Sequence, residues 1–101
     1  MKTFEKVLEI FREYLDNDQD EEVLPSRKGY LRVTWNGDSR YCADGILSRT
    51  PDELFEVLLS DYRGYEELRL TKGRREVSED DEKQAEVLCR NLLERWEEES
   101  E

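Results

Sequence analysis

The stretch from Tyr30 to Ser48 constrains the fold of this chain most, because it places two turn signals between short runs of β-prone residues. Asn36-Gly37 and Asp44-Gly45 are dipeptides that favour tight hairpins, since both turn residues must tolerate positive φ. Two consecutive hairpins predict a three-stranded antiparallel β-meander.

Alternation along this meander predicts which of its faces is buried. An odd-length turn at Asn36 to Asp38 places the apolar residues of the first two strands on one face, and a tight turn at Asp44-Gly45 continues that face. We expect the helices to pack on it. Its members are Leu31, Val33, Trp35, Tyr41, Ala43 and Ile46. The opposite face carries Tyr30, Arg32 and Thr34.

Three stretches with the three-and-four periodicity of amphipathic helices flank the meander. The first has Thr3 as N-cap and an apolar stripe from Phe4 to Leu15. The second begins at Thr50-Pro51-Asp52-Glu53, which supplies an N-cap, a proline at the first helical position and a capping-box glutamate. It ends at Gly64, a C-cap signal. The third is a long helix that Ser78 caps.

Two further strands are expected between the second and third helices. Alternation from Tyr65 to Thr71 predicts a fourth strand, and Arg74 to Val77 predicts a short fifth one. The expected class is α+β: an N-terminal helix, a three-stranded antiparallel β-meander, a helix, additional strands and a long C-terminal helix, with the helices packed on one sheet face. A chain of 101 residues predicts a single domain, residues 1–101, with 97–101 as a frayed acidic tail.

The formal net charge is −11, and the acids gather in clusters at 16–22 and at the C-terminal end. Asp16, Asp18 and Asp20 have the spacing of the first ligands of a calcium loop. The rest of that pattern fails, because Glu21 stands where the loop needs glycine and Arg27 where it needs a bidentate glutamate. We therefore expect no metal site. A chain this acidic should repel nucleic acid and anionic membranes and be attracted to basic protein surfaces.

The chain lacks the residue patterns of common active sites. It has no histidine, its five glycines form no phosphate-binding loop, and its two cysteines make neither a zinc site nor a reactive motif. We expect no enzymatic activity and no cofactor. Cys42 and Cys89 are expected as reduced core residues. No window is apolar enough to span a membrane, which predicts a soluble, cytoplasmic protein. The arginines of the meander are expected to pair with helix carboxylates.

The order of helix, β-meander and further helices in a short acidic chain resembles small inhibitor proteins of phages and mobile elements, including anti-CRISPR proteins. The resemblance rests on element order and on the clusters Asp16 to Glu22 and Glu97 to Glu101. It implies a nucleic-acid mimic that inhibits a nuclease, or another nucleic-acid-handling protein, by occupying its basic surface. The expected partner-binding residues are Asp16, Asp18, Asp20, Glu21, Glu22, Glu97 and Glu98.

The alternative is a small regulatory or structural adaptor whose acidity only keeps it soluble. Such a protein would bind its partner through an apolar patch around Tyr30, Trp35 or Tyr65, and would act as a monomer or as a homodimer. A salt-dependent interaction favours the inhibitor, because salt screens exposed charges, whereas a salt-insensitive one favours the adaptor.

Overall fold

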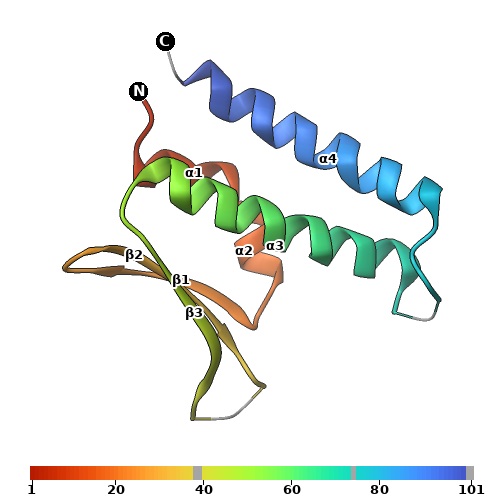
Figure 1. Cartoon of the computed structure of the whole chain (residues 1–101), viewed down its shortest axis with the longest axis horizontal. Helices are drawn as coiled ribbons and strands as arrows, with labels where there is room; N and C mark the ends of the chain where they lie inside the picture. The colour runs from red at the N-terminus through yellow and green to blue at the C-terminus, as the bar shows by residue number, and fades with distance from the viewer. Residues whose placement is uncertain (38–39, 74, 100–101) are drawn as a thin grey trace. The chain divides into compact units, whose positions relative to one another are not determined.

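The computed structural model describes residues 1–37, 40–73 and 75–99. Its elements appear in Figure 1 in the following order. They are α1 (Phe4–Ile10), α2 (Arg12–Asn17), β1 (Glu21–Ser26), β2 (Gly29–Trp35), β3 (Cys42–Ser48), α3 (Pro51–Thr71) and α4 (Glu79–Glu98). The strands form one antiparallel sheet in the order β1-β2-β3. The predicted α+β class, the three-stranded antiparallel sheet and the long C-terminal helix are therefore confirmed.

The chain divides into two compact units. The first, Lys2–Val57, contains α1, α2, the sheet and the beginning of α3. The second starts at Leu58 and contains the rest of α3 and all of α4, together with Met1. That the two units fold as one domain stays a prediction.

The sheet begins earlier in the sequence than predicted. Glu21–Ser26, which lies before the predicted meander, forms β1, whereas Asp44 and Gly45 lie inside β3 rather than in a turn. The first hairpin turns at Arg27-Lys28, between the paired residues Ser26 and Gly29. The prediction was wrong because it looked for asparagine-glycine and aspartate-glycine signals, and this turn uses a glycine after the loop instead.

The connection from β2 to β3 is also longer than the three-residue turn that we predicted. It runs from Trp35 to Cys42, and a β-bulge interrupts the register between Thr34 and Trp35. Gly37 has φ +59, so the Asn36-Gly37 signal does mark a left-handed turn residue in this connection. Asp38, the last residue of the predicted turn, lies outside the described residues.

The sheet face that contacts α1 and α2 is the one that we predicted to point away. The ring centroids of Phe4 in α1 and Tyr30 in β2 are 4.5 Å apart. Tyr14 in α2 interacts with Glu21 in β1, which pairs with Thr34 and so shares a face with Tyr30. Arg32, on this same face, is only 5% exposed.

The predicted apolar face lies opposite the face that contacts α1 and α2. Only some of the residues that we predicted for it lie on it. The register places Leu24, Leu31 and Leu47 together on it, while Ile46 pairs with Arg32 and belongs to the helix-contacting face. Tyr41 precedes β3 and is 78% exposed. Val33 on this face is 4% exposed, as predicted, and Arg32 on the other face is 5% exposed, so the sheet buries residues on both faces rather than on the apolar one alone.

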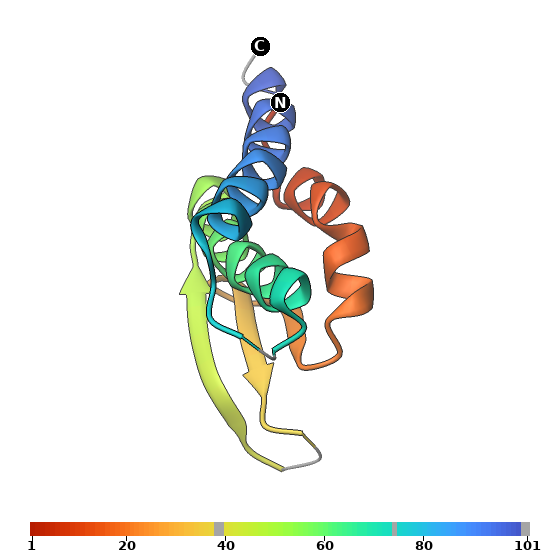
Figure 2. The ribbon, with the colours of Figure 1, turned by 90° about the vertical axis from the view of Figure 1, so that its right-hand side faces the viewer.

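The predicted first helix is divided into two short helices. α1 ends and α2 begins at Phe11, whose φ of −96° and ψ of 11° depart from helical values, and Figure 2 shows the bend between them. The predicted N-cap is confirmed, because Thr3 Oγ1 accepts a hydrogen bond from the Lys6 backbone N–H at 3.1 Å. Val7, Phe11 and Tyr14 from the predicted stripe are buried.

α3 continues well past its predicted end. Its start is as predicted, since Thr50 Oγ1 accepts a hydrogen bond from the Glu53 N–H at 3.2 Å. Gly64 lies within the helix, and the predicted strand Tyr65 to Thr71 is helical. The helix ends at Thr71. Lys72 follows it in the left-handed conformation with φ +57, and Gly73, with φ +66, donates its N–H to Leu68 O at 3.2 Å.

The segment before α4 has no fifth strand among its described residues 75–77, and Arg74 lies outside the described residues. The predicted N-cap of α4 is confirmed, because Ser78 and Asp81 form a capping box. The stripe of α4 is buried at Ala85, Cys89 and Trp96.

Candidate functional site

The structure distributes the seven predicted partner-binding acids between exposed and buried positions. Asp16, Asp20, Glu22, Glu97 and Glu98 are exposed, Asp18 is half-buried, and Glu21 is buried at 7% exposure. The first cluster belongs to the unit Lys2–Val57 and the second to the other unit.

The corner between α2 and β1 explains why two of these acids face inward. Asp18 Oδ2 accepts a hydrogen bond from the Tyr14 hydroxyl at 3.0 Å, and its Oδ1 accepts one from the Asp20 N–H at 3.3 Å. Burial raises the pKa of Tyr14 above its ordinary value, and the carboxylates of Glu21 and Asp18 raise it further. Asp18 and Glu21 therefore hold the corner together.

The remaining acids of this cluster, Asp16, Asp20 and Glu22, have exposed side chains. Asp16 and Asp20 have exposed carboxylates that make no ion pair within the described part of the chain. Glu22 points to the opposite sheet face, where its Oε1 accepts a hydrogen bond from Trp35 Nε1 at 3.0 Å. We define the acidic corner as Asp16, Asp20 and Glu22.

The C-terminal acids Glu97 and Glu98 belong to α4, and the fraying of 97–101 stays a prediction. Glu97 and Glu98 form the last turn of α4. Glu98 makes no ion pair with another described residue, and Ser100 and Glu101 lie outside the described range.

A third acidic group, which was not among the predicted partner-binding residues, lies in the first turn of α4. Asp81 is the buried member of this group. Its carboxylate accepts hydrogen bonds from the hydroxyl and the backbone N–H of Ser78. It also accepts hydrogen bonds from two nitrogens of Arg75, and the distance from Arg75 Nη2 to Asp81 Oδ1 is 3.0 Å. These hydrogen bonds hold the pKa of Asp81 well below its usual range. Glu79, Asp80 and Glu82 remain exposed beside it.

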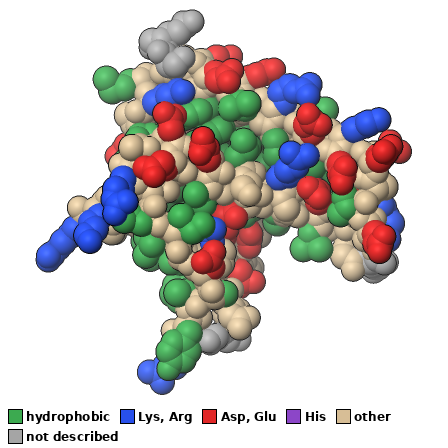
Figure 3. Space-filling view, in the orientation of Figure 1, with side chains coloured by type: hydrophobic (Ala, Val, Ile, Leu, Met, Phe, Trp, Pro, Cys, Tyr) green, Lys and Arg blue, Asp and Glu red, His purple; other side chains and the backbone are tan. Residues whose placement is uncertain are grey.

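Several basic side chains of the meander make no ion pair with a helix carboxylate among the described residues, contrary to our expectation. Arg32 pairs with a strand residue, with Nη1 3.4 Å from Asp44 Oδ2. Arg27, Lys28 and Arg49 are exposed and make no ion pair with any described residue. Figure 3 shows Lys and Arg side chains gathered at the tip of the β1–β2 hairpin.

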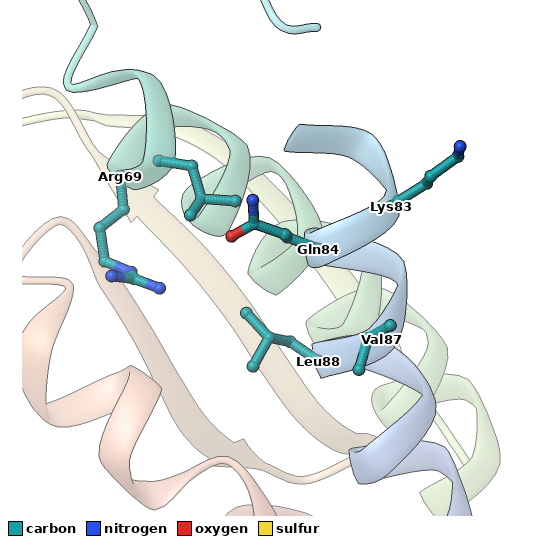
Figure 4. A pocket seen from close by; sticks show the side chains of 6 residues that line it. Arg69, Lys83, Gln84, Val87 and Leu88 are labelled. Atoms are coloured by element: carbon teal, nitrogen blue, oxygen red, sulfur yellow. The ribbon is translucent and has the colours of Figure 1, made fainter. Parts of the chain in front are cut away.

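An apolar cavity lies between α3 and α4 in the second unit. It has a volume of about 420 Å³ and is lined by Arg69, Leu70, Lys83, Gln84, Val87 and Leu88. In Figure 4, Gln84 and Leu88 point toward α3, whereas Lys83 points away. Val87 is 52% exposed, so the cavity opens to solvent through an apolar rim.

The described residues contain no group of three or more acidic, cysteine or histidine side chains that could hold a metal ion. Both cysteines are free, but only Cys89 is the buried residue that we expected, since Cys42 is exposed. Burial raises the pKa of the Cys89 thiol. Among the described helices, none combines the length and apolar character of a membrane span.

No protein-family model, curated protein or solved structure matches this chain. Inference about its function therefore starts from the surfaces described above.

Proposed function

We propose that this chain is a non-enzymatic acidic inhibitor that occupies the basic nucleic-acid-binding surface of a nuclease or another nucleic-acid-handling protein. The observation that carries the proposal is the acidic corner, where the carboxylates of Asp16 and Asp20 are exposed and lack ion-pair partners among the described residues. Unpaired carboxylates keep their full charge for a partner, as the phosphates of nucleic acid do.

The arrangement of the corner supports this role. Tyr14 holds Asp18, and Asp18 in turn holds the backbone N–H of Asp20. The chain between α2 and β1 is therefore ordered before a partner arrives, which lowers the conformational entropy lost on binding. Complementary charge also speeds association, and exposed charges are screened beyond about 8 Å at physiological ionic strength.

The experiment captures partners from host lysate with the immobilised chain and then adds excess duplex DNA or RNA. The supporting result is the capture of a nucleic-acid-binding protein that is released from the immobilised chain both by excess nucleic acid and by added salt. Replacing the acidic corner, Asp16→Asn, Asp20→Asn and Glu22→Gln together, should weaken the capture of that protein by about tenfold or more, by analogy with other charge-dominated interfaces.

A matched variant separates this surface from net charge. Glu5→Gln, Glu56→Gln and Glu94→Gln together remove the same number of exposed acids from other places and should leave capture nearly unchanged. The proposal would be contradicted by a partner that stays bound in excess nucleic acid. It would also be contradicted if both variants lowered the capture of the partner equally.

The second candidate function is an adaptor that binds apolar side chains of a partner in the α3–α4 cavity. The observation that favours it is the apolar rim around Val87, Leu70 and Leu88. Val87→Lys should then abolish a salt-insensitive interaction. Leu93→Lys is the control, because Leu93 is also an exposed apolar residue of α4 but does not line the cavity.

A further inference from the structure

The β1–β2 hairpin ends in a tight turn that presents two basic residues. Ser26 pairs with Gly29, and Arg27 and Lys28 form the loop between them. Ser26 Oγ donates a hydrogen bond to Gly29 O at 3.0 Å and accepts one from the Lys28 N–H at 3.2 Å. The backbone that carries both cations is therefore fixed locally.

A close backbone approach brings a third cation to this turn. Gly29 has φ +144, and a Cβ added to it would lie 2.1 Å from Ser48 O and 3.1 Å from Arg49 Cα. Only glycine tolerates such contact without a shift of the chain. The missing side chain at Gly29 allows Arg49, at the end of β3, to lie against the base of the hairpin tip.

The three cations at this site make no ion pair with a described residue, whereas five other arginines of the chain do. Ion pairs occupy Arg32, Arg63, Arg69, Arg75 and Arg90. Arg27, Lys28 and Arg49 make none with the described residues, although acids outnumber bases 27 to 16 in the chain. Glu53 approaches Arg49, but its Oε1 accepts the backbone N–H at 3.2 Å. We define Arg27, Lys28 and Arg49 as the cationic tip.

The net charge of −11 predicted that the whole chain repels nucleic acid. That expectation assumes that the electrostatic potential is equally negative over the whole surface. Exposed charges more than about 8 Å apart are largely screened at physiological ionic strength, so a ligand at the cationic tip responds mainly to the tip and to the Glu53 carboxylate beside Arg49.

We propose that the cationic tip binds the phosphate backbone of nucleic acid. Arginine and lysine are the side chains that make most phosphate contacts, and the guanidinium of arginine can bind two phosphate oxygens at once. The site holds no arrangement for reading base edges, so the binding is independent of sequence and the affinity is modest. This surface is separate from the acidic corner and does not depend on the proposed inhibitory role.

The test measures binding of the whole chain to a fluorescein-labelled DNA duplex by anisotropy at low and at physiological salt. The native chain should bind, and Arg27→Gln, Lys28→Gln and Arg49→Gln together should weaken binding by about tenfold or more, because three phosphate contacts are lost. Circular dichroism checks that the variant is folded. An absence of binding by the native chain at both salt concentrations overturns the proposal.

A matched variant removes the same charge elsewhere. Arg12→Gln, Arg40→Gln and Arg95→Gln together change exposed cations that also lack ion-pair partners in the described structure, and this variant should bind the duplex like the native chain. Equal loss in both variants means that net charge alone drives binding, which overturns the proposal.

A second probe tests the other class of acidic partner. Poly-L-glutamate should bind less tightly than the duplex, and tip-dependent binding to poly-L-glutamate alone would assign the tip to an acidic protein and overturn the proposal. The acidic-corner variant should bind the duplex at least as well as the native chain. A negative result for the cationic tip therefore does not contradict the proposed inhibitory function, and a negative result for the inhibitory function does not contradict nucleic-acid binding by the tip.

Discussion

At the scale of single residues, Gly29 has the most demanding position in the sheet. Replacing it with alanine forces a side chain into the left-handed region and against Ser48 O. Backbone strain of this kind costs about 1–3 kcal/mol before the steric contact is added, so Gly29→Ala should lower the free energy of unfolding by at least that amount. Urea unfolding followed by circular dichroism measures the change.

Gly37→Ala provides the comparison. Gly37 also has positive φ, but a Cβ there would meet nothing within 4 Å. The Gly37 variant should therefore lose about 1–2 kcal/mol, the cost of the left-handed conformation alone. If the two variants lost equal stability, the close approach at Gly29 would not matter.

The stability of the folded chain should depend on pH through Tyr14. Its pKa is raised in the folded chain, so the stability that its protonated form contributes is present below about pH 10, the unfolded value, and is lost as the pH rises further. The ultraviolet absorbance of the phenolate should show one of the five tyrosines titrating late, in step with unfolding.

Two phenylalanine substitutions assign that late phase. Tyr14→Phe should remove it, whereas Tyr41→Phe, which changes a tyrosine that is 78% exposed, should leave it in place. A late phase that survives Tyr14→Phe would show that another tyrosine is responsible.

At the scale of elements, α3 departs furthest from what the sequence predicts. Gly64 lies in its interior, has no positive φ, and has nothing within 4 Å of an added Cβ. Alanine at this position should raise the free energy of unfolding by about 0.5–1 kcal/mol, since glycine is the weaker helix former. The measurement is urea unfolding followed by circular dichroism, in which the variant should keep its helical signal to a higher urea concentration than the native chain. A loss of stability would instead indicate that the helix ends at Gly64, as the sequence suggested.

The contrast between predicted and observed elements follows the range of the interactions involved. Thr3, Thr50 and Ser78 were identified correctly as caps because a cap depends on hydrogen bonds to residues a few positions away. The segment Tyr65 to Thr71 was assigned to a strand because its alternation was considered without its helical ion pairs, such as Arg69 with Glu66. Helix and strand patterns overlap in so short a segment.

The candidate site shows the same division. That Asp16 and Asp20 are exposed follows from their polar surroundings in the sequence. That Glu21 is buried does not, because its burial depends on Tyr14 crossing from α2 to β1. The cationic tip depends on the contact between Gly29 and the Ser48–Arg49 backbone, which no local pattern reveals.

At the scale of the whole molecule, two electrostatic effects act in opposite directions. The net charge of −11 repels itself in the folded chain and lowers its stability. Ion pairs such as Arg32 with Asp44 and Arg75 with Asp81 raise it. Each of these pairs has one partner that is at most 6% exposed, so salt screens them less than it screens the repulsion between exposed acids.

Salt should therefore stabilise this chain. Raising sodium chloride from about 0.01 M, where the Debye length is about 30 Å, to about 1 M, where it is about 3 Å, removes most of the repulsion. If this recovers about 1 kcal/mol, the melting temperature should rise by roughly 4–8 °C for a chain of this size. The variant Glu5→Gln, Glu56→Gln and Glu94→Gln should melt higher at low salt and respond less, because it has less repulsion to screen. A melting temperature that falls with salt would mean that attraction between paired charges outweighs repulsion between the unpaired acids. The acidic corner would then be less available to a partner than its exposure indicates.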